Sequence, residues 1–201
     1  MASLIIFRHG QSIWNLENRF TGWTDVGLTE KGIEESKEAG EKLKGFHLHK
    51  GYASALKRTQ ESLLIALKVC GQENIPVVFN KALNERNYGD LQGLNKTETS
   101  AKYGSELVNK WRRGYDVAPP NGESLKDTVN RVIPYFEEVI KPELVGNTNI
   151  VTATHGNAMR AIIMHLENID PEEIVKLEFY TGEMRLYEFD NNMNVGMMVQ
   201  L

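Results

Sequence analysis

Short apolar runs alternate with longer amphipathic segments along the chain. Leu4–Phe7 are all apolar, and a run of this length without polar alternation is typical of a strand buried on both faces of a sheet. Further short strands are predicted over Gly51–Ser54, Pro76–Phe79 and Asn149–Ala153. Near the end, the stretch "RLYEFD" predicts an edge strand.

Helical patterns fill the intervals between these strands. Thr29 and Ser124 are residue types that cap the first turn of a helix, and each precedes such a pattern. Strands that alternate with helices imply right-handed crossovers, so we predict an α/β fold with three α/β/α layers and a mostly parallel central sheet. The predicted helices run from Thr29 to about Lys44, from Leu56 to Val69, from Ser124 to about Ile140 with Pro134 as a kink, and over "NAMRAIIMHL".

The segment from 80 to 121 differs from the rest because it is polar throughout. It carries weak helical signals around Lys96–Tyr103 and Glu106–Arg113. A structureless loop of this length is uncommon in a compact domain. We therefore predict one domain over residues 1–201, with 80–121 as a lid or site-building segment.

Composition narrows the classes of function. A chain of 201 residues fits one domain, and its net charge of −4 gives no general reason to expect nucleic-acid binding. The single cysteine, Cys70, excludes an intramolecular disulfide, which suits a reducing compartment. We see no apolar run of membrane-spanning length and no signal-peptide pattern, so we expect a cytoplasmic protein without a membrane partner.

Chemically active residues follow each predicted parallel strand. The carboxyl ends of parallel strands meet at one edge of the sheet, which is the usual site of open α/β folds. Two histidines, two arginines and a carboxylate should therefore converge there. The stretches concerned are Arg8-His9-Gly10, Ser54 with Lys57 and Arg58 a turn later, Asn84-Glu85-Arg86, and Thr154-His155-Gly156-Asn157.

Such a cluster suits a phosphoryl group. Arg8 and Arg58 can grip phosphate oxygens, and their charge favours a neutral His9 with a lone pair free to attack phosphorus. His155 can donate to a non-bridging oxygen, and Glu85 is the best candidate to move the proton. Ser12 is expected to donate a hydrogen bond to the phosphate. The alternative is that the two histidines are ordinary loop residues.

A metal site is disfavoured by the same residues. Arginine charges beside a cation are unfavourable, and the sequence contains no HExxH spacing. His47 and His49 fall in a predicted loop and are expected to be solvated. We expect no metal cofactor.

The motifs resemble those of a known family over nearly the whole chain, from Leu4 to about Phe189. "RHGQS" and "THGNAMR" resemble the histidine phosphatase superfamily, whose reactions pass through a phosphohistidine. More narrowly, the chain resembles the cofactor-dependent phosphoglycerate mutases. The stretches that carry this resemblance are "RHGQSIWNLENRFTGWTD", "ALKRTQES", "LNERNYGDLQGLNK", "WRRGYDVAPP" and "GESLKDTVNRVIP".

The resemblance implies that His9 is the phosphorylated nucleophile, that Arg8, Arg58 and His155 bind the transferring group, and that Glu85 donates and accepts the proton. It also implies a reaction of glycolysis and gluconeogenesis, the interconversion of 3-phosphoglycerate and 2-phosphoglycerate. The enzyme would be primed by 2,3-bisphosphoglycerate, need no metal, and form a small homo-oligomer, with a dimer favoured. The positions that match substrate contacts are Asn15, Thr21, Gly22, Tyr88, Lys96, Arg112, Arg113, Gly156 and Asn157.

Two alternatives to a mutase stay open at this point. A phosphatase would use the same chemistry on another phosphomonoester, but Lys96, Arg112 and Arg113 suit a carboxylated phosphoester. A non-catalytic binding module would retain the fold alone. Against it, every residue that a phosphohistidine mechanism needs is present.

Overall fold

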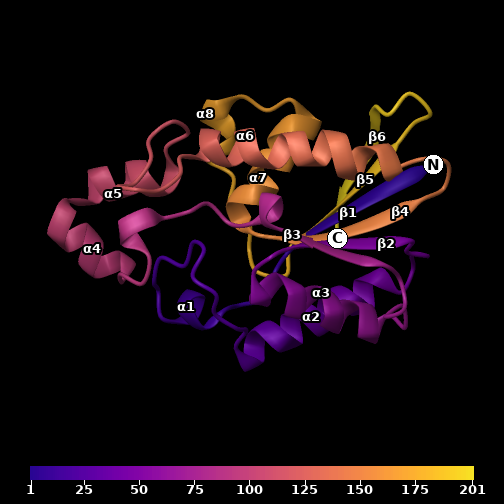
Figure 1. Ribbon diagram of the computed structural model, residues 1–201, viewed down its shortest axis with the longest axis horizontal. Coiled ribbons are helices and arrows are strands. Elements are labelled where there is room, and N and C mark those ends of the chain that lie inside the picture. Colours follow the sequence, from indigo (N-terminus) through magenta and orange to yellow (C-terminus); the bar gives the residue numbers. More distant parts are fainter.

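The computed structural model describes residues 1–201 and contains one six-stranded sheet (Figure 1). The strand order is β3-β2-β4-β1-β5-β6, and the first four strands run parallel. The predicted three-layer α/β class with a mostly parallel sheet is confirmed. The strands are β1 (Ala2–Arg8), β2 (Lys50–Ser54), β3 (Val77–Asn80), β4 (Asn149–Thr154), β5 (Met184–Phe189) and β6 (Val195–Gln200).

Helices cover both faces of the sheet. In Figure 1, α2 and α3 lie on one side and α6 and α7 on the other. The α-helices are α1 (Ile13–Leu16), α2 (Glu30–Leu43), α3 (Lys57–Val69), α4 (Lys96–Tyr103), α5 (Ser105–Arg113), α6 (Leu125–Tyr135), α7 (Gly156–Glu167) and α8 (Pro171–Ile174). The shorter turns are η1 (Lys81–Leu83), η2 (Gly89–Leu91), η3 (Phe136–Ile140) and η4 (Lys141–Glu143).

The apolar run of β1 has no polar alternation because both of its faces are buried. Leu4 and Ile6 belong to the hydrophobic cluster on the α6 and α7 side. Ile5 and Phe7 point the other way, into the cluster that packs with α2 and α3. The period of two along a strand therefore divides one apolar run between two cores.

The end of the chain differs from the prediction. The "RLYEFD" stretch forms β5, which is not an edge strand: it pairs antiparallel with β1 on one side and with β6 on the other. We did not predict β6, which is the edge strand. Its residues are half-buried or exposed, so the sequence shows no clear apolar alternation there.

The predicted helix from Ser124 is interrupted after Pro134. The α-helix α6 ends at Tyr135, and Phe136–Ile140 continue as a π-helical turn. Proline has no backbone N–H to donate within the helix, so the change of hydrogen-bonding pattern close to it has a local cause.

The segment from 80 to 121 folds into η1, η2, α4 and α5. Figure 1 shows α4 and α5 at one end of the molecule, away from the sheet. A small third hydrophobic cluster, Phe20, Leu91, Val108 and Trp111, holds the segment against the chain that follows α1. Its role as a lid stays a prediction.

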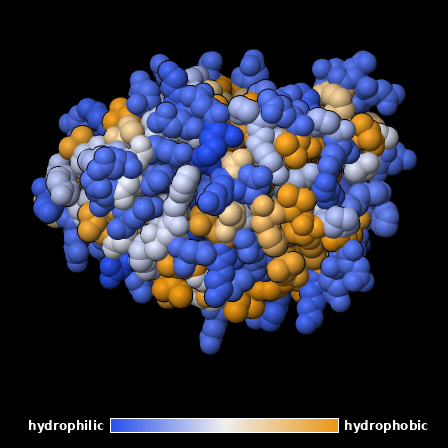
Figure 2. Space-filling model, viewed as in Figure 1, coloured by the Kyte–Doolittle hydropathy of each residue, from blue (hydrophilic) through white to orange (hydrophobic).

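One face carries an apolar patch. Figure 2 shows apolar side chains gathered over β3 and α3, where Phe79 and Leu64 are exposed. None of the helices has both the length and the apolar character that crossing a membrane requires.

Candidate active site

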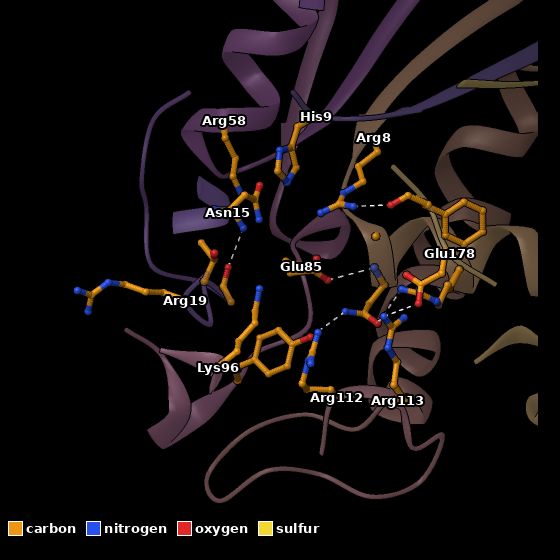
Figure 3. Close-up of a pocket in the computed structure, with 17 residues that line it drawn as sticks. Arg8, His9, Asn15, Arg19, Arg58, Glu85, Lys96, Arg112, Arg113 and Glu178 are labelled. Carbon is orange, nitrogen blue, oxygen red and sulfur yellow. Dashed lines mark hydrogen bonds and ion pairs between the residues drawn. The ribbon is translucent and has the colours of Figure 1, made fainter. Parts of the chain in front are cut away.

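A cavity of about 230 Å³ opens beside the carboxyl ends of the parallel strands. Figure 3 shows Arg8, His9 and Arg58 along one side of it, Lys96, Arg112 and Arg113 along the other, and Glu85 between them. The cavity brings together most of the predicted site residues. Those in its wall are Arg8, His9, Asn15, Thr21, Gly22, Arg58, Glu85, Tyr88, Lys96, Arg112, Arg113, Gly156 and Asn157.

His9 stands directly after β1 and is 2% exposed. Its Nδ1 lies 2.6 Å from the carbonyl oxygen of Gly10, which can only accept, so Nδ1 carries the proton and Nε2 keeps a lone pair. Burial, and then the charges of Arg58 and Arg8, hold the pKa of His9 well below its ordinary value of 6.5. His9 is therefore a neutral base with Nε2 as its nucleophilic atom.

Gly10 is required by a close approach of two backbones. A Cβ on Gly10 would lie 2.1 Å from the carbonyl oxygen of Gly32, in the first turn of α2. A Cβ on Gly32 would likewise meet the backbone of Gln11 at 2.1 Å. The glycine after His9 thus lets α2 pack against the loop that carries His9.

Two arginines flank His9, the buried Arg58 and the half-buried Arg8. Arg58 donates to the carbonyl oxygens of Gly22, at 2.8 Å, and Thr24, at 3.2 Å, and burial lowers its pKa to about 10. Arg8 donates from Nη1 to the carbonyl of Phe179, while its buried Nε has no partner among the protein atoms. Guanidinium groups that lie beside a histidine and retain N–H donors without a protein partner are suited to bind the oxygens of a phosphoryl group.

His155 is fully buried behind His9 rather than in the cavity wall. The two ring centroids are 4.9 Å apart in an edge-to-face arrangement. Its Nε2 lies 2.8 Å from the Ser54 hydroxyl, and its buried Nδ1 has no partner among the protein atoms. Burial, followed by the charge of Arg58, holds the pKa of His155 well below 6.5.

The carboxylate of Glu85 is fixed by one oxygen only. Its Oε1 accepts the backbone N–H of Arg86 at 2.8 Å and that of Asn157, in the first turn of α7, at 3.2 Å. The structure records no hydrogen bond to its Oε2. Glu85 therefore keeps one oxygen available for proton transfer.

The main chain of Glu85 is held as well. Its carbonyl accepts from the indole Nε1 of Trp23 at 2.6 Å and from Nη2 of Arg131 at 3.3 Å. Arg131 also donates to the carbonyl of Asn84 and pairs with Glu123 at 2.7 Å. Trp23 and Arg131 therefore hold the main chain that carries the predicted acid–base carboxylate.

The far side of the cavity comes from α4 and α5. Burial, and then the nearby Arg112, lower the pKa of Lys96. Arg113 forms an ion pair with Glu178 at 2.5 Å. Beneath them, the buried Arg86 donates to the carbonyl of Arg112, which ties α5 to the Glu85 segment.

Tyr88 lies beside these cations. Burial alone would raise the pKa of its hydroxyl, but the Arg86 guanidinium outweighs that effect, and the pKa is lowered overall. The same hydroxyl accepts from Nδ2 of Asn157 at 3.4 Å. Tyr88 therefore links the far side of the cavity to α7.

Sequence reasoning missed four residues of the cavity wall. Arg160 lies one helical turn after Asn157, and its position in α7 could have revealed it. Burial lowers the pKa of Arg160 to about 10. Glu178 and Phe179 follow α8, in a stretch with no motif, and Arg19 lies beyond α1; only the tertiary structure brings them to the site.

Ser12 lies apart from the cavity wall. Its side chain is fully buried, accepts the backbone N–H of Asn15 and donates to the Asn15 side chain as the N-cap of α1. Ser12 thus caps α1 and orients Asn15, and its contact with phosphate stays a prediction. No cluster of three or more histidine, cysteine, aspartate or glutamate side chains is arranged to hold a metal ion.

Comparisons with known proteins agree with this geometry. Residues 4–198 match the histidine phosphatase superfamily (branch 1). A 2,3-bisphosphoglycerate-dependent phosphoglycerate mutase from Cytophaga hutchinsonii is 50% identical, over 98% of this chain and 92% of its own length. One from Parvibaculum lavamentivorans is 48% identical, over 94% and 90%.

Solved structures share the fold. A phosphoglycerate mutase from Bacillus anthracis superposes with a TM-score of 0.80 at 22% identity, covering 100% of this chain and 91% of its own. A mycobacterial glucosyl-3-phosphoglycerate phosphatase gives 0.84 at 23% identity, covering 100% and 98%. At these identities the likeness concerns the fold alone. The chain belongs to the histidine phosphatase superfamily and, within it, to the family of 2,3-bisphosphoglycerate-dependent phosphoglycerate mutases.

Proposed function

We propose that this protein interconverts 3-phosphoglycerate and 2-phosphoglycerate by transferring a phosphoryl group to and from His9. One observation carries the proposal. The cavity has a neutral histidine between two arginines at one end and three further cations at the other, with one oxygen of Glu85 available between them. A substrate with a phosphate at one end and a carboxylate at the other matches this arrangement.

The phosphoryl end uses His9, Arg8 and Arg58. In the first transfer the phosphoryl group leaves Nε2 of phosphorylated His9 for the free hydroxyl of the substrate, and Glu85 takes the proton of that hydroxyl. In the second transfer the Nε2 lone pair of His9 forms a bond to the other phosphorus as the bond from that phosphorus to the substrate oxygen breaks, and the released oxygen takes the proton back from Glu85. The arginines hold the charge on the non-bridging oxygens throughout.

The opposite end binds the part of the substrate that does not react. Lys96, Arg112 and Arg113 can bind a carboxylate, or the second phosphate of a bisphosphate. The wall contains seven cationic side chains against two carboxylates, Glu85 and Glu178, so it suits a highly charged anion. This charge is local, because the whole chain carries a net charge of −4.

The residues present fit 2,3-bisphosphoglycerate as a primer. When bound, this molecule supplies the phosphoryl group that His9 must carry before it can act on a monophosphate. Arg8 and Arg58 would hold the reacting phosphate, and Lys96 with Arg112 the other groups. A primer of this kind requires no metal ion.

The test follows 2-phosphoglycerate formation from 3-phosphoglycerate with and without catalytic 2,3-bisphosphoglycerate, in the presence of a chelator. We expect turnover that depends on the bisphosphate and does not respond to the chelator. Phosphate release without isomerisation would instead identify a phosphatase. Ligand binding without turnover would identify a binding module.

The oligomeric state also belongs to the proposal. The dimer expected from the resemblance stays a prediction, and the apolar patch with Leu64 and Phe79 offers a surface for it. Light scattering on the purified protein measures the mass directly. A mass of 22.8 kDa would contradict the dimer.

A further inference from the structure

Three buried side chains form a hydrogen-bonded chain that the mechanism above does not use. Ser54, at the end of β2, and Thr59, in the first turn of α3, are fully buried, as is His155. The Ser54 hydroxyl lies 2.8 Å from Nε2 of His155 and 2.6 Å from the Thr59 hydroxyl. Such a chain has a limited number of protons, and their distribution decides which nitrogen of His155 is protonated.

The positions of these protons follow from the Thr59 end of the hydrogen-bonded series. The Thr59 hydroxyl lies 2.8 Å from the Leu56 carbonyl oxygen, which can only accept, so Thr59 donates there. Thr59 must then accept from Ser54. The Ser54 hydroxyl also accepts the backbone N–H of Leu56 at 3.1 Å. With its own proton given to Thr59, Ser54 can only accept from His155, and Nε2 must carry the proton.

The opposite distribution satisfies fewer groups. If Ser54 donated to Nε2, Thr59 would have to donate to Ser54. The Thr59 oxygen would then face the Leu56 carbonyl oxygen at 2.8 Å with no proton between them. A buried contact of two acceptors is unfavourable, so the first distribution is the stable one.

We propose that Ser54 and Thr59 are positioning residues that fix His155 as a donor from Nε2 and leave Nδ1 without a proton in the free protein. The proposal includes a contact between Nδ1 of His155, which has no partner among the protein atoms, and an oxygen of the phosphoryl group bound at the neighbouring His9. Nδ1 can donate to that oxygen only after the ring has taken up a second proton from solvent. His155 is therefore neutral in the free protein and becomes an imidazolium when the phosphoryl group is bound. This consequence rests on the proposed function, whereas the tautomer does not.

The surroundings of His155 agree with a ring that gains its charge only with the ligand. The charged and titratable groups that act on it are Arg8 and His9 at the end of β1, Arg58 in α3 and Arg131 in α6. The arginines are cations and His9 is a neutral base, so none of them favours a proton on Nδ1 of the free protein. An incoming phosphoryl dianion reverses that balance.

Nitrogen-15 NMR on histidine-labelled protein tests the proposal. The chain has five histidines, so a His155→Gln variant assigns the His155 resonances. We expect the free wild-type protein at pH 7 to show a neutral ring with its proton on Nε2. We expect saturating inorganic phosphate or orthovanadate to convert this ring to the doubly protonated form.

Variants of Thr59 test the hydrogen-bonded series of Thr59, Ser54 and His155. Thr59→Val removes the acceptor for the Ser54 proton, so Ser54 donates to Nε2 and the His155 proton moves to Nδ1. Thr59→Ser should retain the wild-type tautomer. Thr128→Val is the matched control, because Thr128 is equally buried and donates to a carbonyl, that of Ser124, in α6.

Activity gives a second measurement. In Thr59→Val, His155 contacts the phosphoryl group as a neutral donor instead of a cation. We expect kcat to fall about tenfold, the usual difference between a charged and a neutral hydrogen bond, with KM nearly unchanged. Thr59→Ser should restore kcat.

Three results would overturn the proposal. These are a proton on Nδ1 in the free wild-type protein, an unchanged tautomer in Thr59→Val, and a neutral His155 in the phosphate complex. The wild-type spectrum decides the tautomer even if the variant does not fold. If the protein binds neither phosphate nor vanadate, the proposed function fails while the tautomer result stands.

Discussion

The two ends of the cavity are built in opposite ways. The phosphoryl end, with Arg8, His9 and Arg58, lies at the carboxyl edge of the sheet, and its arginines are held by backbone carbonyls. The outer end lies on the short helices α4 and α5. There the Arg113 side chain is 37% exposed and pairs with Glu178, which is 57% exposed.

This difference separates two tasks. A buried end that is fixed before the substrate arrives needs little reorganisation during the reaction, so it suits the chemical step. At the exposed end, Arg113 can exchange its Glu178 partner for an anionic group of the substrate, so this end suits substrate recognition. Substitutions at the first end should lower kcat, and substitutions at the second should alter KM.

The largest effect is expected from His9→Ala. This change removes the atom that bonds to phosphorus, so turnover should fall by on the order of 10⁵–10⁶-fold. Incorporation of acid-labile phosphate from labelled 2,3-bisphosphoglycerate should disappear. His49→Ala, at an exposed histidine just before the amino end of β2, is the control and should label normally. Retained labelling in His9→Ala would exclude His9 as the nucleophile.

The next largest effect is expected from Glu85→Gln. The amide keeps the shape of the side chain but cannot exchange the proton, so kcat should fall about 10²–10⁴-fold with KM little changed. Steady-state kinetics of 3-phosphoglycerate conversion measure both constants. Glu123→Gln, which weakens the pair with Arg131 and the hydrogen bond from the backbone N–H of Asn87, should have a much smaller effect on kcat. Equal losses in the two variants would mean that Glu85 acts through structure alone.

A third effect concerns stability at the buried end. His9 and His155 have pKa values well below 6.5 in the folded protein, so only the unfolded chain binds protons at these residues as the pH falls below about 6.5. The stability that they contribute is complete above this value and is lost below it. The free energy of unfolding should therefore fall by up to about 1.4 kcal/mol per pH unit for each histidine.

Urea unfolding between pH 7.5 and pH 5 measures this slope. His9→Gln should reduce this slope by up to about 1.4 kcal/mol per pH unit, because one of the two histidines is removed. Carboxyl groups contribute equally to the slopes of the wild type and the variant. A slope that is the same in wild type and in His9→Gln would contradict the low pKa of His9.

The smallest effect is expected at the outer end. Glu178→Gln removes the carboxylate that pairs with Arg113, so the anionic substrate no longer competes with it. An exposed pair contributes little, and KM should fall by about two- to fivefold with kcat unchanged. Glu106→Gln, which breaks the exposed pair with Lys110 on the same helix, is the control. A rise in KM on losing Glu178 would show that this side chain contacts the substrate directly.

Much of the phosphoryl end could be predicted because its residues are placed by local features of the sequence. The apolar run of β1 and the residues that follow each parallel strand place His9, Glu85 and Gly156 at one edge, whatever the details of packing. The β5 position could not be predicted in the same way. Its apolar alternation is compatible with either an edge or an inner strand, and β6 beside it has little apolar signal of its own.

The sequence by itself determined which chemically active groups meet, because residue type and strand direction suffice to bring a histidine, two arginines and a carboxylate together. Only the tertiary structure decided how those groups are held. The Ser54–Thr59 chain behind His155, the Trp23 and Arg131 contacts to the Glu85 carbonyl, and the Glu178 pair all join segments distant in the sequence. Such contacts depend on the packing of whole elements, which no local pattern of residues encodes.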